Sequence, residues 1–321
     1  MVKSTMFIES AGVETVVIDS VSLIQSVIDA VIQLRTDIPP LFIDLEGVEL
    51  GRHGSISIMS FYLPSCKRVY LIDIYRLKTE AFSAVNSDGK SLKSILESSV
   101  IMKVLFDVRH DSDALFSHYG ISVDGIKDVQ LMELGTREGA KDFLAGLDRC
   151  VEKDSTISAT EKKAWKLIKD NGLRLFDPAL GGRYEVFNER PVPQAIAKYC
   201  AGDVTLLPDL FKIYFAKLNL PGEAFWEHHV LEATKERIRL SRSSGFDGTS
   251  KSNARGPWDR ESIEEAINQW NDDILDDALS CGDNDFYGLE DSDDDCGWQD
   301  DGPTSCRDII NDCDYGYYYS D

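Results

Sequence analysis

Acidic residues occur at three positions in this chain that are defined by the surrounding pattern: the end of an apolar strand, the start of one helix and the interior of another. Asp44 and Glu46 end an apolar strand pattern, LFIDLE. Asp111 lies at the start of a helical pattern, DSDALFSHYG, and Asp203 lies within a longer one, AIAKYCAGDVTLL. Four carboxylates that meet in space cannot all stay ionised without cations between them. The simplest partner is a pair of divalent metals, whose simplest chemistry is phosphodiester hydrolysis.

The segments that separate these residues predict a mixed α/β domain. Three strand-like runs, LFIDLEGV, SISIMSFYL and RVYLIDIY, follow one another with turn signals between them and predict a three-stranded meander. A strand, TVVI, and a helical pattern that stops at Pro39 precede it. A helix, a strand (VIMKVLFD), a helix from His110 to Tyr119 that ends at Gly120 and another short strand follow. Helical periodicity then dominates to about Leu240.

The negative charge of the chain is concentrated at its C-terminal end. Of the net charge of −22, residues 271–321 hold 17 acidic residues against one basic residue. The remainder is only mildly acidic and has no basic face for a long duplex. A nuclease that holds only a strand end does not need such a face, because its metals supply local positive charge. We therefore predict a domain at residues 14–241, followed at 242–321 by a polar linker, one possible acidic helix and a tail whose composition favours disorder.

Cysteine usage and hydropathy bear on the compartment. The chain has seven cysteines, an odd number, and no Cys-x-x-Cys, so neither a zinc site nor a disulfide framework is signalled. The N-terminal residues do not resemble a secretory signal, and no apolar stretch approaches the length of a membrane span. We expect an intracellular protein of the cytoplasm or nucleus that is not embedded in a membrane. The sequence identifies no protein partner.

Taken singly, the acidic patterns also have plain structural explanations. Asp44 and Glu46 are two apart on a strand and share one face, which describes a solvated strand end equally well. Tyr199 and Asp203 are four apart on a helix and share one face, as do many core tyrosines with a nearby exposed aspartate. The occurrence of all the patterns in this order, around a meander and two helices, favours a common site.

The second acidic pattern leaves three residues to choose from. Asp107, Asp111 and Asp113 crowd one segment, and Asp107 lies one helical turn before Asp111. Asp107 is suited to cap the following helix, and Asp113 to lie on the solvated surface. Spacing alone does not choose among them.

Together the patterns resemble the DEDD-type 3′–5′ exonucleases of the tyrosine subclass, which include ribonuclease D and the Werner-syndrome exonuclease domain. The first motif, Asp-x-Glu, matches Asp44 and Glu46 in FIDLEG. The second, an aspartate that opens a helix ending at a glycine about nine residues later, selects Asp111. The third, Tyr-x-x-x-Asp, matches Tyr199 and Asp203.

Two further features refine this resemblance. The sister subclass has a histidine where this chain has Lys198, which places the chain in the tyrosine subclass. The segment LFDPALGGRYEVFNERP resembles the fungal-type members, although this chain has Asp-Val-Gln at Asp128 where many members have Asp-Thr-Gln. The resemblance covers about residues 16–218 and implies a ribonuclease H-like fold, a mixed sheet flanked by helices.

The resemblance also implies an activity. Two Mg²⁺ or Mn²⁺ ions would be held by Asp44, Glu46, Asp111 and Asp203, and Tyr199 would orient the attacking water. The substrate would be the 3′ end of single-stranded RNA or DNA, released as nucleoside 5′-monophosphates. One alternative is a non-catalytic, exonuclease-like protein that binds nucleic acid or acts as an adaptor; another is a different ribonuclease H-like nuclease, such as an endonuclease.

Two sets of side chains are weaker candidates for substrate contacts. The candidates for stacking on the last base are Leu45, Phe106, Tyr184 and Phe187. The candidates for phosphate contacts lie in the helical stretch KKAWKLIK and are Lys162, Lys163, Lys166 and Lys169. A solvated basic helix face explains the four lysines at least as well.

Overall fold

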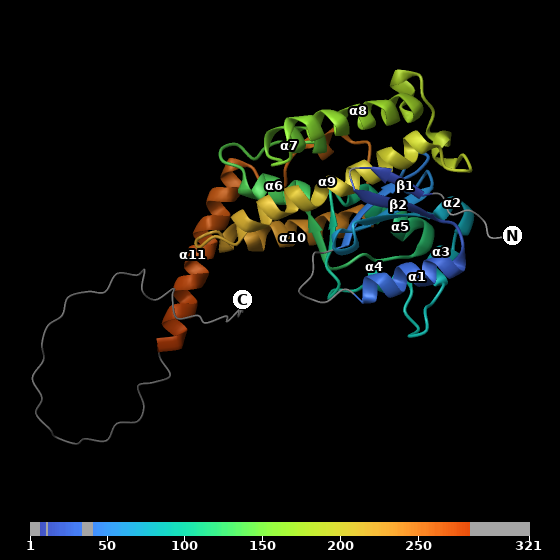
Figure 1. Cartoon of the computed structure of the whole chain (residues 1–321). Coiled ribbons are helices and arrows are strands. Elements are labelled where there is room, and N and C mark those ends of the chain that lie inside the picture. Colours follow the sequence, from blue (N-terminus) through green and yellow to red (C-terminus); the bar gives the residue numbers. More distant parts are fainter. Residues whose placement is uncertain (1–6, 11, 34–40, 283–321) are drawn as a thin grey trace, which may run out of the picture. The chain divides into compact units, whose positions relative to one another are not determined.

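A seven-stranded mixed sheet forms the centre of the fold, in the order β1-β2-β5-β4-β3-β6-β7 (Figure 1). The computed structural model describes residues 7–10, 12–33 and 41–282. The strands are β1 (Phe7–Ser10), β2 (Val13–Ile18), β3 (Leu41–Glu46), β4 (Ile58–Leu63), β5 (Arg68–Asp73), β6 (Lys103–Leu105) and β7 (Ile126–Asp128). Strands β3, β4 and β5 are antiparallel neighbours, which confirms the predicted meander. Strands β6 and β7 extend the sheet parallel to β3, and β2 lies parallel to β5.

Helices cover both faces of this sheet, as the predicted α/β fold requires. They are α1 (Val21–Ile32), α2 (Ile74–Leu77), α3 (Glu80–Ser83), α4 (Leu92–Leu96), α5 (Arg109–Tyr119), α6 (Val129–Thr136), α7 (Leu147–Lys153), α8 (Ala159–Phe176), α9 (Gln194–Leu218), α10 (Ala224–Ser241) and α11 (Arg260–Gly282). Strand β1 and the short helices α2 and α3 were not predicted. The proline stop at Pro39 lies outside the described residues.

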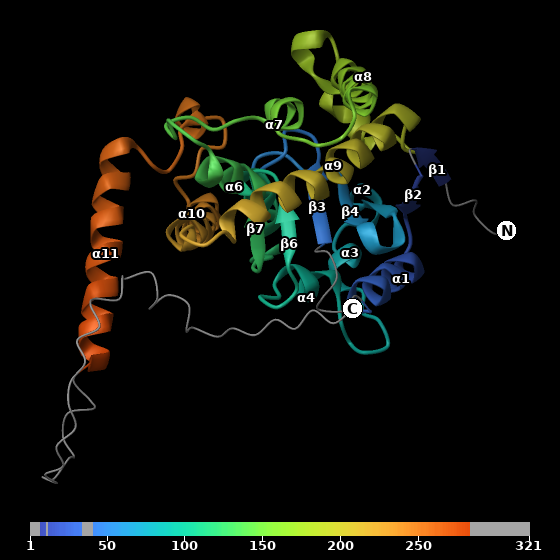
Figure 2. The ribbon, with the colours of Figure 1, turned by 60° about the vertical axis from the view of Figure 1, so that its left-hand side comes forward.

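The alternation of side chains along β3 divides the core in two. Ile43 and Leu45 pack in one cluster, with α1, α4 and part of α5. Phe42 packs in the other, under α9. Because alternate residues of a strand share a face, Asp44 and Glu46 point to the same side as Phe42, toward α9. Figure 2 shows α9 crossing over the strands on that side.

The segment between α8 and α9 is fixed by polar contacts rather than by regular structure. It forms two short 3₁₀ turns, Pro178–Leu180 and Tyr184–Asn188. Arg190 then anchors its end to the sheet, because the guanidinium donates from Nε and Nη2 to the two carboxylate oxygens of Asp73, each at 2.6 Å. This segment therefore fixes the position at which α9 begins over β3.

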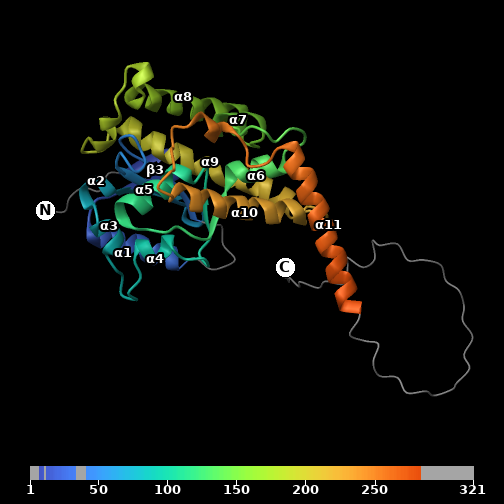
Figure 3. The ribbon, with the colours of Figure 1, turned by 180° about the vertical axis from the view of Figure 1, so that it is seen from behind.

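The segment after α10 packs on the domain. We refer to residues 242–258 as the C-terminal strap; they were expected to form a polar linker. The Leu144 amide donates to the carbonyl of Ala254 at 3.0 Å, and the Gly256 amide donates to that of Asp142 at 2.8 Å. Figure 3 shows the strap between α10 and α11. Contacts divide the chain into units at 1–270 and 271–321, so we extend the proposed domain from residue 241 to Trp270.

The expected acidic helix corresponds to α11, whereas the acidic tail beyond residue 282 lies outside the described residues. Among the helices that are described, none combines the length and the apolar character that crossing a bilayer requires.

Candidate metal centre

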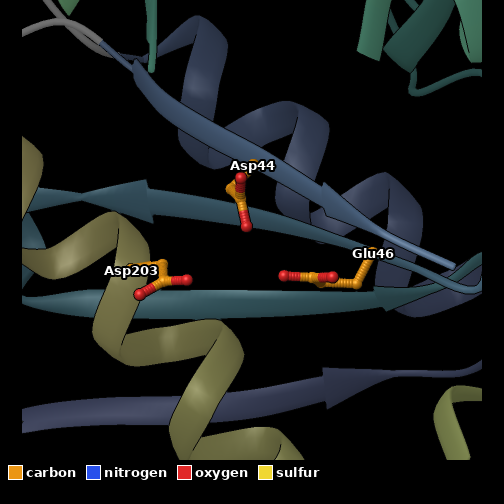
Figure 4. A group of neighbouring side chains, drawn as sticks. All are labelled: Asp44, Glu46 and Asp203. Carbon is orange, nitrogen blue, oxygen red and sulfur yellow. The ribbon is translucent and has the colours of Figure 1, made fainter. Parts of the chain in front are cut away.

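Three carboxylates from two distant parts of the chain converge above the sheet. Asp44 and Glu46 project from β3, and Asp203 projects from α9, which crosses that strand (Figure 4). One carboxylate oxygen from each residue lies within 4.8 Å of the others, so a single cation could contact all three. The β3 pair shares a face because of strand alternation, and α9 supplies the third group because it packs over β3.

Asp111 lies beside this group but is not one of the three. It is in the first turn of α5 and is 6% exposed. Burial, and then the negative charge of Asp44, raise the pKa of Asp111 well above its usual range. Its Oδ1 atom is buried and has no hydrogen-bond partner in the described part of the chain, and the same holds for Oδ2 of Asp44. Buried carboxylate oxygens without partners are what a cation would satisfy.

The two rivals of Asp111 are each paired with an arginine. Asp107 accepts from Nε and Nη2 of Arg109, each at 2.6 Å. Asp113 accepts from the backbone amide and Nε of Arg52, each at 2.8 Å, and is 3% exposed. The expectation that Asp113 is a solvated surface residue was therefore wrong.

Asp107 directly precedes the N-terminus of α5, and a hydrogen bond from the backbone amide of Arg109, the first residue of that helix, is among the contacts that lower the pKa of its carboxyl. Asp107 has a φ of +61° and donates its backbone amide to the carboxylate of Asp128 at 3.1 Å. The next amide, that of Val108, donates to the same carboxylate at 3.2 Å. Asp128, at the end of β7, thus satisfies the two backbone amides that directly precede α5.

Tyr199 lies one helical turn before Asp203, with its ring packed between α8 and α9. Its ring is 5.0 Å from that of Phe176 in an edge-on arrangement. A Cβ atom on Gly172 would lie 2.5 Å from Cδ2 of Tyr199, so the glycine in α8 makes room for the ring. Burial, followed by the negative charges of Glu46 and Asp203, raises the pKa of the Tyr199 hydroxyl, which stays protonated at neutral pH.

The carboxyl groups themselves are held in an environment that opposes their ionisation. Burial first, and then the negative charge of Asp203, raise the pKa of Asp44 to about 7. The pKa of Glu46 is also raised well above its usual range by burial and by the charge of Asp44. A set of carboxylate oxygens with raised pKa values and buried, unpartnered atoms fits hard divalent cations such as Mg²⁺ and Mn²⁺.

Lys169, on α8, is part of this site in a way that its sequence pattern did not indicate. Its Nζ donates to both carboxylate oxygens of Asp203, each at 3.0 Å. The sequence grouped it with three neighbouring lysines as a phosphate contact or a solvated face. The spacing of Lys169, Gly172 and Phe176 is the signal that was available, because residues three and seven apart share a helix face.

Two of the four stacking candidates are enclosed in the core. Leu45 is 3% exposed and Phe187 is 1% exposed, so neither can hold a base. The ring of Phe187 packs 4.9 Å from that of Phe176 instead. Phe106 and Tyr184 are half-buried and keep surface that a base could contact.

Known proteins resemble this chain in sequence and in fold. Residues 22–218 match the family described as 3′–5′ exonuclease. The piRNA biogenesis protein EXD1 of Mus musculus is 35% identical over 172 residues, which are 52% of this chain and 27% of that protein. EXD1 of Homo sapiens is 35% identical over 178 residues, which are 52% of this chain and 30% of that protein. The matching region thus spans less than a third of the length of these relatives.

Solved structures with the same fold include two ribonucleases. RNase D of Trypanosoma brucei in complex with RNA U12 superposes with a TM-score of 0.59 and 19% identity, over 78% of each chain. RNase D of Escherichia coli superposes with a TM-score of 0.50 and 16% identity, over 71% of this chain and 50% of that one. At these identities the likeness supports the ribonuclease H-like exonuclease fold.

Proposed function

The chain belongs to the 3′–5′ exonuclease family, and on that premise we propose that it hydrolyses single-stranded nucleic acid from the 3′ end with two divalent ions. The products would be nucleoside 5′-monophosphates. The observation that carries the proposal is the convergence of Asp44, Glu46 and Asp203 within 4.8 Å, with Asp111 beside them. The tyrosine subclass and the fungal-type assignment rest on the sequence patterns and stay predictions.

The residues divide naturally between two ions. Asp44, Glu46 and Asp203 would hold one ion. Asp44 and Asp111 would hold the other, because Asp44 belongs to the first group and is also close enough to Asp111 for its charge to raise the pKa of that residue. Bound Mg²⁺ or Mn²⁺ would supply positive charge at the scissile phosphate and at the leaving 3′ oxygen. The protein holds the four carboxylates in place before substrate arrives.

Tyr199 would position the attacking water rather than take its proton. Its pKa is raised by burial and by the neighbouring carboxylates, so the hydroxyl keeps its proton and is a poor base. The ring is packed against Phe176 and faces Gly172, which restricts its rotation. A hydroxyl fixed in this way contributes by orientation.

RNA is the first substrate to test. The 35%-identical relatives are named for piRNA biogenesis, and a protein of this fold has been solved with a bound RNA. Phe106 and Tyr184 are the remaining candidates for stacking on the terminal base. Discrimination against DNA would need a contact to the 2′-hydroxyl.

A second function is favoured by one observation. The carboxylate of Asp203 has a cation already, because Lys169 contacts both of its oxygens. A site that is partly neutralised by its own lysine suits a non-catalytic, exonuclease-like protein that binds nucleic acid or acts as an adaptor. The intact set of four carboxylates and the tyrosine favours the enzyme.

The experiment that separates the two functions uses 5′-labelled single strands of RNA and DNA with Mn²⁺. An exonuclease gives a ladder that shortens from the 3′ end, which EDTA abolishes and a blocked 3′ end prevents. Asp44→Asn is the control for a contaminating nuclease. Binding of the strand without shortening, in the presence of Mn²⁺, would favour the non-catalytic function.

A further inference from the structure

Lys169 occupies a position in which it is both buried and surrounded by acidic groups. Its side chain is 14% exposed, and that of Asp203 is 10% exposed. A second carboxylate, that of Asp148 in α7, lies 3.8 Å from the same Nζ. Asp148 is 49% exposed, so solvent screens its contact, whereas the Lys169–Asp203 pair is largely shielded and its attraction is stronger than that of a surface pair.

The side chain of Lys169 is enclosed by two aromatic rings. Its Nζ lies 5.3 Å from the centre of the Tyr199 ring and 5.4 Å from that of Trp165. These rings limit the directions that the ammonium group can take, and their faces attract a cation. The contact with Asp203 is therefore one of few arrangements open to the lysine.

Helix α8 is itself fixed to α9, so Lys169 does not rely on its own contacts for its position. In the segment just before α8, Ser155 donates its hydroxyl to Asp209 of α9 at 2.6 Å, and Thr156 donates its amide to the same carboxylate at 2.9 Å. About one turn before the helix ends, Gly172 packs directly against Tyr199. Lys169 lies between these two attachments.

We propose that Lys169 is a positioning residue that holds Asp203 in the metal-free protein and releases it to an incoming divalent cation, so that the lysine sets the metal affinity of the site. The proposal rests on the proposed function in assuming that Asp203 binds metal. Both oxygens of Asp203 accept from Nζ, so the lysine competes with an incoming cation for the lone pairs of these oxygens. A positive charge next to the site also opposes a second one.

The test compares Mn²⁺ binding by calorimetry, at pH 8, in the full chain and in three variants. Lys169→Met removes the charge and keeps a long apolar side chain that fits between the two rings. Lys169→Arg keeps the charge. Lys166→Met removes a charge from the same helix at an exposed position and serves as the matched control. Thermal melting in EDTA is measured for each protein.

We expect Lys169→Met to bind Mn²⁺ on the order of tenfold more tightly than the wild type, because a competitor and a repelling charge are both removed. It should melt at a lower temperature in EDTA, because Asp203 then lacks its cation. Lys169→Arg and Lys166→Met should stay close to the wild type in both measurements. A weaker or unchanged affinity in Lys169→Met would overturn the proposal, since it would mean that the lysine only supports the fold or the Asp203 rotamer.

Failure of the proposed function gives a different result. If neither the wild type nor Lys169→Met binds Mn²⁺, the proposed metal-dependent activity is overturned. The inferred release of Asp203 to a metal is then overturned too, whatever the melting temperatures. If only Lys169→Met binds, the release to metal in the wild type is overturned and the lysine blocks the site outright, in agreement with the non-catalytic function. Tighter binding in the variant than in a metal-binding wild type supports both proposals.

Discussion

Whether an acidic residue of this domain is available to a metal depends on its basic neighbours. Asp107 and Asp113 each accept from an arginine, and both are thereby satisfied. Within the described residues, Asp44, Glu46 and Asp111 form no such ion pair. The arginine pairing of Asp113 and the lack of one at Asp111 separate a structural aspartate from a ligand candidate at a spacing of two residues, whereas Asp203 is a ligand candidate that is paired with Lys169.

Asp111→Asn and Asp113→Asn should therefore have different effects. We expect Asp111→Asn to lower turnover by on the order of a hundredfold or more and to leave stability close to normal, because a ligand oxygen is lost without a protein partner. Asp113→Asn weakens the contact with Arg52 and should lower the free energy of unfolding by about 1–3 kcal/mol. Exonuclease assays and urea denaturation measure the two effects; the opposite ranking would mean that the metal ligand is Asp113.

Tyr199→Phe tests the role of the hydroxyl. Turnover should fall, because the attacking water loses its orienting group, whereas the Kd for Mn²⁺ should stay near the wild-type value. Asp203→Asn should impair both. Calorimetric titration alongside single-turnover kinetics separates the two quantities, and an equal loss of metal affinity in Tyr199→Phe would count against a purely positioning role.

Helix α8 is the element that completes the site from outside the sheet. On one face of this helix, Lys169 forms an ion pair with Asp203 and Gly172 packs against Tyr199. The helix was expected from its periodicity, but its function follows from its packing on α9. The close approach of the two helices depends on the absence of a side chain at Gly172.

Gly172→Ala should accordingly displace the Tyr199 ring or separate the helices. We expect a loss of about 1–3 kcal/mol in stability together with reduced turnover, since the added Cβ would lie 2.5 Å from the ring. Gly202→Ala is the matched control within α9, because its added Cβ would meet its nearest neighbour, Trp165, at 3.5 Å. Alanine favours a helix interior over glycine, so that variant should be neutral or slightly stabilised. Equal melting temperatures for the two variants would contradict this account.

At the scale of the whole molecule, the C-terminal strap connects the end of α10 to the helix that carries Asp111. Arg52 donates to the carbonyl of Ser241 at 2.7 Å and packs its guanidinium against Phe246 of the strap. Arg109 donates to the carbonyl of Asn253 at 2.9 Å. The first turn of α5 is thus held partly by residues that the sequence suggested were a linker.

Truncation after Ser241 should therefore destabilise the domain, whereas truncation after Trp270 should preserve it. We expect the protein truncated after Ser241 to melt several degrees lower than the one truncated after Trp270, since a hydrogen-bonded segment of the domain is removed. The longer one loses all 17 acidic residues of the C-terminal end. If these residues inhibit by repelling the substrate, this truncated protein should be more active than the full chain at low salt and similar at high salt. Identical melting curves for the two truncations would return the boundary to residue 241.

The metal-free domain should become less stable as the pH rises, whereas carboxylates in salt bridges make a protein more stable as the pH rises. The pKa of Asp44 is raised in the folded state from 3.8 to about 7, so between these values the folded chain binds more protons than the unfolded one. Stability in EDTA should then fall as pH rises from about 4 to 7. Mn²⁺ affinity should rise over the same range, because ligands must lose their protons. Melting curves with EDTA and with Mn²⁺ at several pH values measure both trends.

The sequence by itself determined the local elements and the chemical character of the site. Strand alternation placed Asp44 and Glu46 on one face, helical spacing placed Tyr199 beside Asp203, and the meander followed from the three apolar runs. These inferences succeed because hydrogen-bonded periodicity is set by neighbouring residues. The family motifs added the choice of Asp111, which spacing alone had left open.

Only the tertiary structure decided which charges are paired. Arg52 with Asp113 and Lys169 with Asp203 join residues that are 61 and 34 positions apart. The enclosure of Phe187 and the packing of the strap likewise depend on contacts between distant segments. Such contacts are fixed by how helices and sheet bury their surfaces against one another, so a local spacing can show which residues share a face but not which distant residue they will meet.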